Sequence, residues 1–244
     1  MTEYNLCEFL VSGAREMGIA ISEAQAAEFA HFHEMLVETN RVMNLTRVPD
    51  DPREAVDRNY LDSLAPLAAG LPTGVRTLAD VGAGAGFPGI PLAILLPEVH
   101  VVLIDALGKR VKFLQGVIEA LGLNAEAVHA RAEDAGRQPE LRERFDVVTA
   151  RAVAALNVLA ELALPLVRVG GEMIAYKGPG AAQEASEAEK AIAMLGGQLL
   201  REQTVVIPGR DWDHRLLYIQ KRVPTPKKYP RRPGEPGKNP LGQI

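Results

Sequence analysis

Hydrophobic residues in the first part of the chain recur at the three- and four-residue intervals of an amphipathic helix. Phe29, Phe32 and Leu36 follow this spacing, so they would share one face of a helix, and we interpret that face as core packing. Ser22 and Gln25 precede the repeat in the arrangement of a capping box, in which each side chain binds the backbone of the other residue. The pattern predicts helices here and lacks the alternation of a strand.

From Val75 onward the pattern changes to short apolar runs that alternate with helical stretches. This alternation is typical of a parallel β-sheet whose strands are joined by helices. A short turn-rich link before the last strand predicts an antiparallel pair at the sheet edge. The expected strands are 77–81, 99–104, 126–129, 145–149, 172–176, 198–207 and 214–221. The expected helices include 52–67, 108–121, 154–166 and 181–195.

Pattern and composition divide the chain into three segments. We expect residues 1–72 to form a helical region packed on the main domain, residues 73–222 to form the α/β domain, and residues 223–244 to form a basic, proline-rich tail. A length of 244 residues suits one large domain with such additions. The composition of the tail predicts an extended segment that is poorly ordered without a partner.

Charge is distributed unevenly along the chain. The formal net charge is −4, but residues 220–244 contain seven basic residues and one acid, so this segment carries +6 and the remainder −10. A basic interaction tail on an acidic body is the usual meaning of such asymmetry. No apolar run reaches the roughly 18 residues that span a membrane. The sequence does not begin with the pattern of a secretory signal peptide, and its Cys and His residues lack the spacing of metal ligands. We therefore expect a cytoplasmic protein without a metal or a membrane partner.

The most unusual stretch covers residues 77–96, where a short strand, a glycine-rich turn and the start of a helix follow one another. Gly82, Gly84, Gly86 and Gly89 leave the turn almost without side chains. Each glycine loses more backbone entropy on folding than any other residue, so four of them make sense where a ligand presses against the backbone. A tight strand-to-helix connection without a ligand is the alternative.

Asp105 follows the second strand of the predicted sheet. In a wound α/β sheet, ligands lie at the carboxyl ends of the strands, and a carboxylate at this place accepts hydrogen bonds from the two hydroxyls of a ribose. We therefore expect a cofactor that contains adenosine. The alternative is a solvated aspartate at the start of a helix.

Two adenosine cofactors compete for the turn. Residues 84–89 match the GxGxxG pattern of NAD-binding proteins, although this pattern alone is weakly specific. Asp80 lies two residues before the first glycine, where its carboxylate would repel the pyrophosphate of a dinucleotide. S-adenosylmethionine carries an ammonium and a sulfonium, which both favour a nearby carboxylate. The sequence therefore favours S-adenosylmethionine, with an aspartate that only caps the turn as the alternative.

The run DVGAGAGFPGIPLAIL resembles the cofactor loop of the glucose-inhibited division protein B family, the guanine-N7 methyltransferases of 16S ribosomal RNA. The resemblance covers nearly the whole chain, and its most specific parts are FPGIP and the basic tail. One departure lies at residues 58–60, where the family often has an aromatic or histidine context. The other matching motifs lie at residues 44–46, 61–64, 105 with 109–110, 131–133, 150–152, 176–178, 229–231 and 237–241.

The resemblance implies an α/β fold of the class I S-adenosylmethionine-dependent methyltransferases, a Rossmann-like seven-stranded sheet with an N-terminal helical cap. It also implies that Asp105 binds the ribose and that Glu133 lies near the adenine. Together with Asp80 from the charge argument, the expected cofactor-binding residues are Asp80, Gly82, Gly84, Phe87, Asp105, Ala106, Leu107, Ala132, Glu133 and Arg151.

Guanine N7 has an exposed lone pair and loses no proton when it attacks a sulfonium methyl group. We therefore expect no general base, and catalysis mainly by positioning the acceptor, the methyl carbon and the sulfur in line. Arg151, at the end of the fourth strand, is the expected positioning residue for the cofactor pocket and the acceptor pocket. A structural salt bridge to an acid such as Asp80 is the alternative role for Arg151.

The expected RNA-binding residues lie at the rim of the site and in the tail. Arg131 and Lys177 at the rim would hold phosphates, with simple solvent exposure as an equal alternative. The tail combines cations with a stacking ring, as segments that bind single-stranded nucleic acid do, and a solubility tail is the alternative. The expected tail contacts are Lys227, Lys228, Tyr229, Arg231 and Arg232.

We expect 16S rRNA or the 30S subunit as the partner and a monomer as the active form. The residues alone leave two other functions open. One is an NAD-dependent oxidoreductase, against which Asp80 counts. The other is a non-catalytic RNA-binding protein that has kept the fold.

Overall fold

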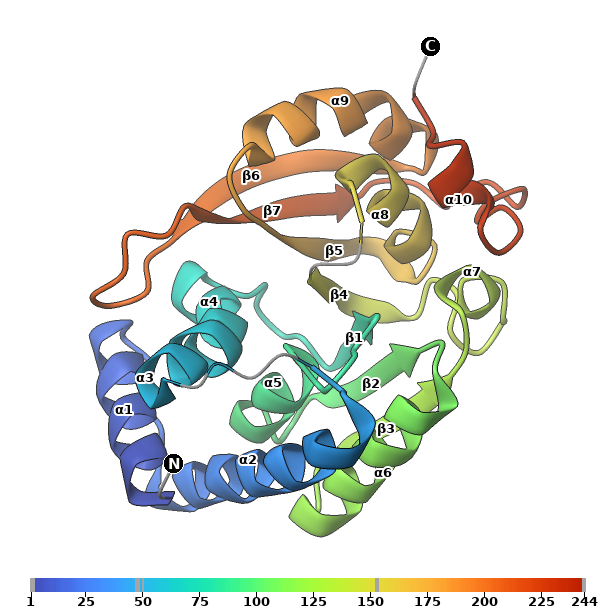
Figure 1. The fold of residues 1–244 in the computed structure, drawn as a ribbon. Coiled ribbons are helices and arrows are strands. Elements are labelled where there is room, and N and C mark those ends of the chain that lie inside the picture. The colour runs from blue at the N-terminus through green and yellow to red at the C-terminus, as the bar shows by residue number, and fades with distance from the viewer. Residues whose placement is uncertain (1–2, 47–48, 50, 152–153, 243–244) are drawn as a thin grey trace.

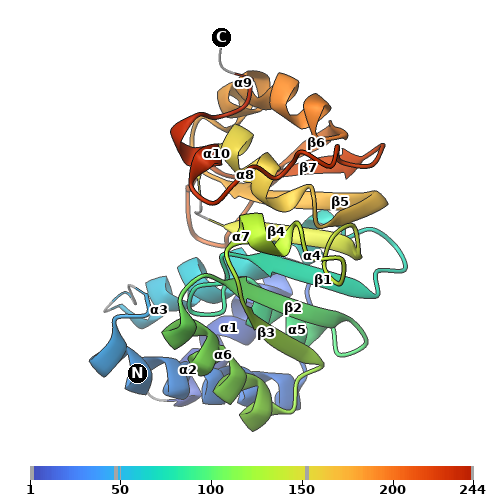
Figure 2. The same cartoon turned by 90° about the vertical axis from the view of Figure 1, so that its right-hand side faces the viewer.

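The computed structural model describes residues 3–46, 49, 51–151 and 154–242, so Ala152 of the fourth-strand motif and the last two tail residues lie outside the described residues. The chain forms a seven-stranded sheet of order β3-β2-β1-β4-β5-β7-β6 with helices on both faces (Figure 1). Strands β1 to β5 pair in parallel, whereas β7 is antiparallel to both of its neighbours. The predicted α/β class and the predicted antiparallel edge pair are confirmed. Figure 2 shows the strands in this order from β6 to β3.

The element bounds agree with the predicted ones in most places. The strands are β1 (Thr77–Val81), β2 (His100–Asp105), β3 (Ala125–His129), β4 (Phe145–Arg151), β5 (Val167–Lys177), β6 (Gly197–Val205) and β7 (His214–Lys221). The helices are α1 (Glu3–Glu16), α2 (Glu23–Met43), α3 (Pro52–Ala55), α4 (Asp62–Ala69), α5 (Gly89–Leu95), α6 (Gly108–Leu121), α7 (Ala132–Ala135), α8 (Leu156–Ala163), α9 (Ala181–Met194) and α10 (Glu235–Lys238), and η1 (Val56–Leu61) is a π-helix.

Strand β5 begins earlier than expected. The sequence predicts a start at residue 172, but Gly170 and Gly171 already lie inside the strand, where the pairing with β4 shifts register. Gly170 has a φ of +87°, which an L side chain rarely adopts. The two glycines therefore make an irregularity within β5 and do not end it.

Alternate residues of the strands face opposite sides of the sheet and build two separate cores. On β2, Val101 and Leu103 join the core covered by α1, α2, α4, α5 and α6. Val102 and Ile104 join the core covered by α7, α8 and α9. The central strands are thus buried on both faces, and the carboxyl ends of the parallel strands are left to form a site.

The amino-terminal helices form as the pattern predicts, with one difference. The capping box at α2 is present: Gln25 N donates to Ser22 Oγ at 3.2 Å, and Ser22 N donates to Gln25 Oε1 at 3.0 Å. The helix expected over residues 52–67 is interrupted by the π-helical turn η1, in which Asp62 N donates to the carbonyl of Asp57. A π-turn widens a helix locally, and such turns are frequent at functional sites.

The tail differs from the loosely ordered segment that its composition predicts. Tyr229 and Leu241 lie in the second core, with exposed fractions of 5% and 9%. Residues 223–242 pass beside α7 and α8 and end near α9, and α10 lies at this side of the molecule (Figure 1). A few anchoring side chains thus outweigh the proline- and glycine-rich composition of the segment.

Candidate functional site

The glycine-rich turn between β1 and α5 presents bare backbone at the carboxyl edge of the sheet. Gly82, Gly84 and Gly86 have φ angles of 73°, 59° and 99°, which explains why glycine stands at these positions. The nearest atom to a Cβ built on Gly84 would be the carbonyl oxygen of Gly82, at 3.7 Å. A ligand can therefore approach the backbone at Gly84 closely.

Asp80, in strand β1, supports the turn through hydrogen bonds of its carboxylate. Its Oδ2 accepts a hydrogen bond from Gly89 N at 2.9 Å, and its Oδ1 accepts one from Thr149 Oγ1 at 3.2 Å. The side chain is 1% exposed, and this burial raises the pKa of Asp80 to about 7. A Cβ on Gly89 would clash with Leu103 and Asp80, so the glycine is needed for the close packing of α5 against the strands. Asp80, an expected cofactor-binding residue, is thus buried behind the turn and bonded to other residues of the protein.

Asp105 ties the end of β2 to the same turn. Its Oδ2 accepts a hydrogen bond from Gly84 N at 2.9 Å, and its Oδ1 accepts one from Leu107 N at 2.8 Å. The guanidinium of Arg110 lies 3.5 Å from Oδ2. The structure therefore brings together three expected cofactor positions, Gly84, Asp105 and Leu107, around one carboxylate.

Ala132 and Glu133 begin α7, which starts three residues after the end of β3. Glu133 is buried, and its Oε1 accepts a hydrogen bond from Gly234 N of the tail at 2.8 Å. Its Oε2 lies 3.7 Å from Nε of Arg131, whose side chain is largely exposed. The adenine-side position expected from the sequence is thus in direct contact with the tail.

Arg151 connects the turn to the amino-terminal helices. Its Nη1 donates to Asp62 Oδ2 at 2.9 Å and to the backbone carbonyl of Arg58 at 3.1 Å. Its guanidinium carbon lies 5.4 Å from the centre of the Phe87 ring. Of the two roles considered for Arg151, a salt bridge is present, but its partner is Asp62 and not Asp80.

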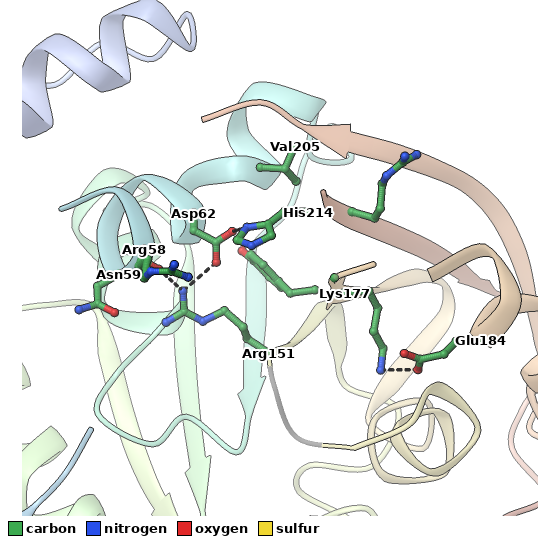
Figure 3. A pocket seen from close by; sticks show the side chains of 11 residues that line it. Arg58, Asn59, Asp62, Arg151, Lys177, Glu184, Val205 and His214 are labelled. Atoms are coloured by element: carbon green, nitrogen blue, oxygen red, sulfur yellow. Dashed lines mark hydrogen bonds and ion pairs between the residues drawn. The ribbon is translucent and has the colours of Figure 1, made fainter. Parts of the chain in front are cut away.

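A pocket of about 490 Å³ opens on the other side of Arg151. Figure 3 shows Asp62 between Arg151 and His214, whose Nδ1 lies 3.0 Å from Asp62 Oδ1. The pocket lies at the carboxyl ends of β4 and β5 and is closed on one side by η1 and α4. Its lining residues are Arg58, Asn59, Asp62, Arg151, Tyr176, Lys177, Gly178, Glu184, Val205, His214 and Arg215.

The predicted RNA contacts fall into two groups. Arg131, Lys227, Lys228 and Arg232 are exposed, as a phosphate-binding side chain must be. Lys177 is 9% exposed in its side chain and pairs with Glu184, at 2.8 Å.

Two of the expected tail contacts need correction. The ring of Tyr229 is buried in the second core and cannot stack on a base in this arrangement. The guanidinium of Arg231 is held by Glu161, with 2.6 Å between Nη2 and Oε2. Local sequence contains no sign of this ion pair, because Glu161 lies 70 residues away from Arg231 along the chain.

Two residues at the centre of the pocket, Asp62 and His214, are absent from the predicted set of site residues. Asp62 belongs to a motif that the resemblance identified, and its position four residues after Arg58 on a polar helix face was an available signal. His214 starts an edge-pair strand, where nothing in the local sequence distinguishes it. Its approach to Asp62 depends on how α4 packs beside the last two strands.

The described part of the chain contains no cluster of three or more potential metal ligands. Among the same residues, no helix combines the length and the apolar character that crossing a bilayer would require.

Comparison with known proteins gives close sequence relatives. Residues 25–211 match the GidB family model, described as rRNA small subunit methyltransferase G. The chain is 45% identical over 237 residues to ribosomal RNA small subunit methyltransferase G of Lactobacillus johnsonii, which covers 96% of this chain and 99% of the relative. It is 46% identical over 227 residues to the protein of the same name from Geobacillus thermodenitrificans, over 93% of this chain and 95% of the relative.

Solved structures resemble the chain at the level of the fold. An O-methyltransferase from Bacillus cereus in complex with SAH aligns with a TM-score of 0.55 and 20% identity, over 88% of this chain and 100% of that one. P. horikoshii TYW2 in complex with MeSAdo aligns with a TM-score of 0.52 and 18% identity, over 73% of this chain and 65% of that one. Both likenesses agree with the seven-stranded sheet described above.

Proposed function

The chain belongs to the GidB family, rRNA small subunit methyltransferase G, and from this membership we propose that it transfers a methyl group from S-adenosylmethionine to N7 of a guanine in 16S rRNA. The observation that carries the proposal is the position of Arg151. This residue contacts Phe87 of the glycine turn on one side and Asp62 of the large pocket on the other. A cofactor site at the turn and an acceptor site in the pocket would therefore share one side chain.

The turn and the strand ends fit S-adenosylmethionine. The backbone at Gly84 is open to a ligand, and the Asp105 carboxylate beside it would accept hydrogen bonds from ribose hydroxyls. Phe87 offers an apolar ring next to Arg151. We assign the cofactor to Gly82, Gly84, Phe87, Asp105, Ala106, Leu107, Ala132, Glu133 and Arg151, with Asp80 holding the turn from below.

The cofactor supplies the methyl group on a positively charged sulfur, and the protein supplies alignment. Two acceptors, Asp62 Oδ2 and the carbonyl of Arg58, hold the guanidinium of Arg151 in place. The guanidinium would therefore keep a fixed position between the cofactor site and the acceptor site. Such fixed alignment is a large source of rate in transfer reactions. Asp62 places negative charge in the acceptor pocket, where it can stabilise the positive charge that a methylated guanine ring acquires. Guanine N7 carries no proton, so no general base is required.

Exposed cations are the candidate contacts for the acceptor RNA. Arg131, Lys227, Lys228 and Arg232 are exposed, and Arg58 lines the pocket itself. Cations that neutralise phosphates supply much of the affinity of nucleic-acid complexes, without sequence preference. We propose that these residues hold RNA phosphates, whereas Tyr229, Arg231 and Lys177 serve other contacts.

We further propose a division of tasks along the chain. Residues 1–72 would supply the Asp62 side of the acceptor pocket, residues 73–222 the cofactor site, and residues 223–244 RNA-binding cations. The partner would be 16S rRNA or the 30S subunit in the cytoplasm, and the active form would be a monomer.

A thermal-shift comparison of cofactors tests the cofactor assignment, because a ligand that binds only the native state must stabilise it. S-adenosylmethionine or S-adenosylhomocysteine should raise the melting temperature, and NAD should leave it unchanged. A rise with NAD alone would favour the oxidoreductase alternative. Binding of S-adenosylmethionine without methyl transfer to any form of 16S rRNA would favour the non-catalytic alternative.

A further inference from the structure

The carboxyl-terminal residues 223–242, here called the strap, contact the side of the molecule on which the adenosine end of the cofactor is expected. The strap follows β7 and passes beside α7 and α8 before α10 (Figure 1). Its contacts are specific polar ones in addition to the burial of Tyr229 and Leu241. The strap is therefore held in a defined position on the α/β domain.

The strongest attachment of the strap is the pair between Arg231 and Glu161. Glu161 lies in α8 with a side chain that is 0% exposed. Its Oε1 accepts from the backbone N of Arg231 at 2.8 Å and from Nε at 2.9 Å, and its Oε2 accepts from Nη2 at 2.6 Å. Loss of the arginine would leave a buried carboxylate without its counter-ion, which is strongly unfavourable. The pair therefore fixes the strap to one position on α8.

Two arginines that follow α7 hold the backbone of the strap from the other side. Arg142 Nη1 donates to the carbonyl of Tyr229 at 2.8 Å, and its Nη2 donates to the carbonyl of Thr225 at 2.7 Å. Arg137 Nε donates to the carbonyl of Pro230 at 2.9 Å. The strap is thus bound to the segment that begins with Ala132, one of the expected cofactor positions.

Beyond Arg231 the strap reaches Glu133 itself. Gly234 has a φ of +81°, and its N–H donates to Glu133 Oε1 at 2.8 Å. Glu133 is buried, so its carboxylate depends on this amide and on Arg131 to remain in place. Displacement of the strap would leave the carboxylate free to rotate at the edge of the cofactor site.

We propose that docking of the strap and binding of S-adenosylmethionine are coupled through Glu133, and that Arg231 and Glu161 are positioning residues for the cofactor site. The inference rests on the role proposed above for Glu133. Coupling between two binding events is reciprocal, so bound cofactor must stabilise the docked strap by the same factor by which the strap strengthens cofactor binding. Typical couplings correspond to about 5- to 150-fold.

Hydrogen exchange of the wild-type protein tests one direction of the coupling. We expect saturation with S-adenosylhomocysteine to slow amide exchange in residues 223–242 at least about fivefold. Peptides from α1, which packs in the core on the opposite face of the sheet, serve as the internal reference. Equal strap exchange in the free and saturated protein, with binding verified by calorimetry, would overturn the coupling.

Variants test the other direction. Arg231→Ala should weaken S-adenosylmethionine binding about tenfold or more, and Arg231→Lys should restore part of it. Lys238→Ala, which removes an exposed cation from the same strap, should leave the affinity within twofold. In steady state, Arg231→Ala should raise KM for S-adenosylmethionine while kcat and KM for RNA change little. A rise in KM for RNA alone would make Arg231 an RNA contact and would contradict the proposal.

The two proposals fail in different ways. If the wild-type protein binds no S-adenosylmethionine, the proposed function and the coupling both fall. If it binds the cofactor and methylates RNA, but neither strap exchange nor the affinity of Arg231→Ala changes, the function stands and only the coupling is refuted.

Discussion

Arg151 Nη1 donates to Asp62 Oδ2 at 2.9 Å and so joins the carboxyl end of β4 to the first residue of α4. Eighty-nine residues separate the two along the chain. The pair forms the boundary between the glycine turn and the large pocket, since Arg151 also lies against Phe87. The helical amino-terminal region thereby becomes part of the site, beyond its role as a cover for the sheet.

Removing the guanidinium should disturb alignment more than stability. We expect Arg151→Ala to lower kcat on the order of 100-fold, because small misplacements in an aligned transfer have effects of this size. Asp62→Asn should give a smaller loss, since the amide still accepts a hydrogen bond but carries no charge. Transfer of a labelled methyl group measures both. Arg168→Ala, which breaks the exposed pair with Asp146 in β4, is the matched control and should stay within twofold.

The ribose role of Asp105 predicts a loss of cofactor affinity. Asp105→Ala should weaken S-adenosylmethionine binding, both because ribose hydroxyls lose an acceptor and because Gly84 N and Leu107 N lose theirs. Calorimetric titration measures the dissociation constant, and circular dichroism checks that the fold is retained. Asp134→Asn, an exposed position in α7, is the control. An unaltered titration of Asp105→Ala would remove Asp105 from the ribose site.

The glycine turn illustrates how much the sequence predicted. The positions of Gly82, Gly84, Asp105 and Arg151 at the strand ends followed from the alternation of strands and helices, since parallel strands bring their carboxyl ends to one edge. The contact between Asp62 and His214 did not follow, because it depends on packing between α4 and β7 across more than 150 residues. Local sequence carries no signal for a contact of that range.

For the tail, the sequence predicted less order than the structure has. Its proline, glycine and basic residues predicted an extended segment, since composition measures the average tendency of a stretch. A few anchoring residues decide the outcome here: Tyr229 enters the second core, and Arg231 meets the buried Glu161. A solvated tail could also contain a tyrosine and an arginine, so residue type alone does not reveal these two anchors.

Two glycine-to-alanine substitutions distinguish a glycine that is needed for close packing from one that only adds backbone freedom. Gly89→Ala should lower the free energy of unfolding by about 1–3 kcal/mol, because the new methyl group would meet Leu103 and Asp80. Gly116→Ala in α6 meets no atom within 4 Å and should raise it by about 0.5–1 kcal/mol. Denaturant unfolding measures both values. Equal effects at the two positions would contradict the packing assigned to Gly89.

Exposed tail cations should determine the salt dependence of RNA binding. Replacing Lys227, Lys228 and Arg232 by alanine should weaken binding and reduce the slope of log K against log salt by about 0.7–0.9 for each phosphate that is no longer neutralised. The same change at the exposed Lys112 of α6 is the control. Truncation after Arg222 should flatten the slope as well, but it also removes Tyr229 from the core and so needs a stability measurement beside it. An unchanged slope would exclude the tail from RNA binding.

The buried His33 should make stability depend on mildly acid pH. Its Nδ1 lies 2.8 Å from the hydroxyl of Tyr60, and burial lowers the pKa of His33 to about 4. The unfolded chain therefore binds the proton first, and the free energy of unfolding should fall as pH decreases from about 6.5 to 4. His33→Gln should make this decline shallower, whereas His31→Gln, at an exposed position two residues away, should not. Parallel pH profiles for wild type and His33→Gln would refute the assignment.

Methyl transfer to guanine N7 of 16S rRNA, with S-adenosylmethionine held by the turn between β1 and α5, is the activity on which the site assignments depend. The decisive assay incubates the wild-type protein with labelled S-adenosylmethionine and either naked 16S rRNA or 30S subunits, followed by nuclease digestion and identification of the labelled nucleoside. We predict a single product, N7-methylguanosine, whose rate of formation falls on the order of 100-fold with Arg151→Ala. Label on another atom or another base, or no label on either substrate from a protein that binds the cofactor, would contradict the proposed activity.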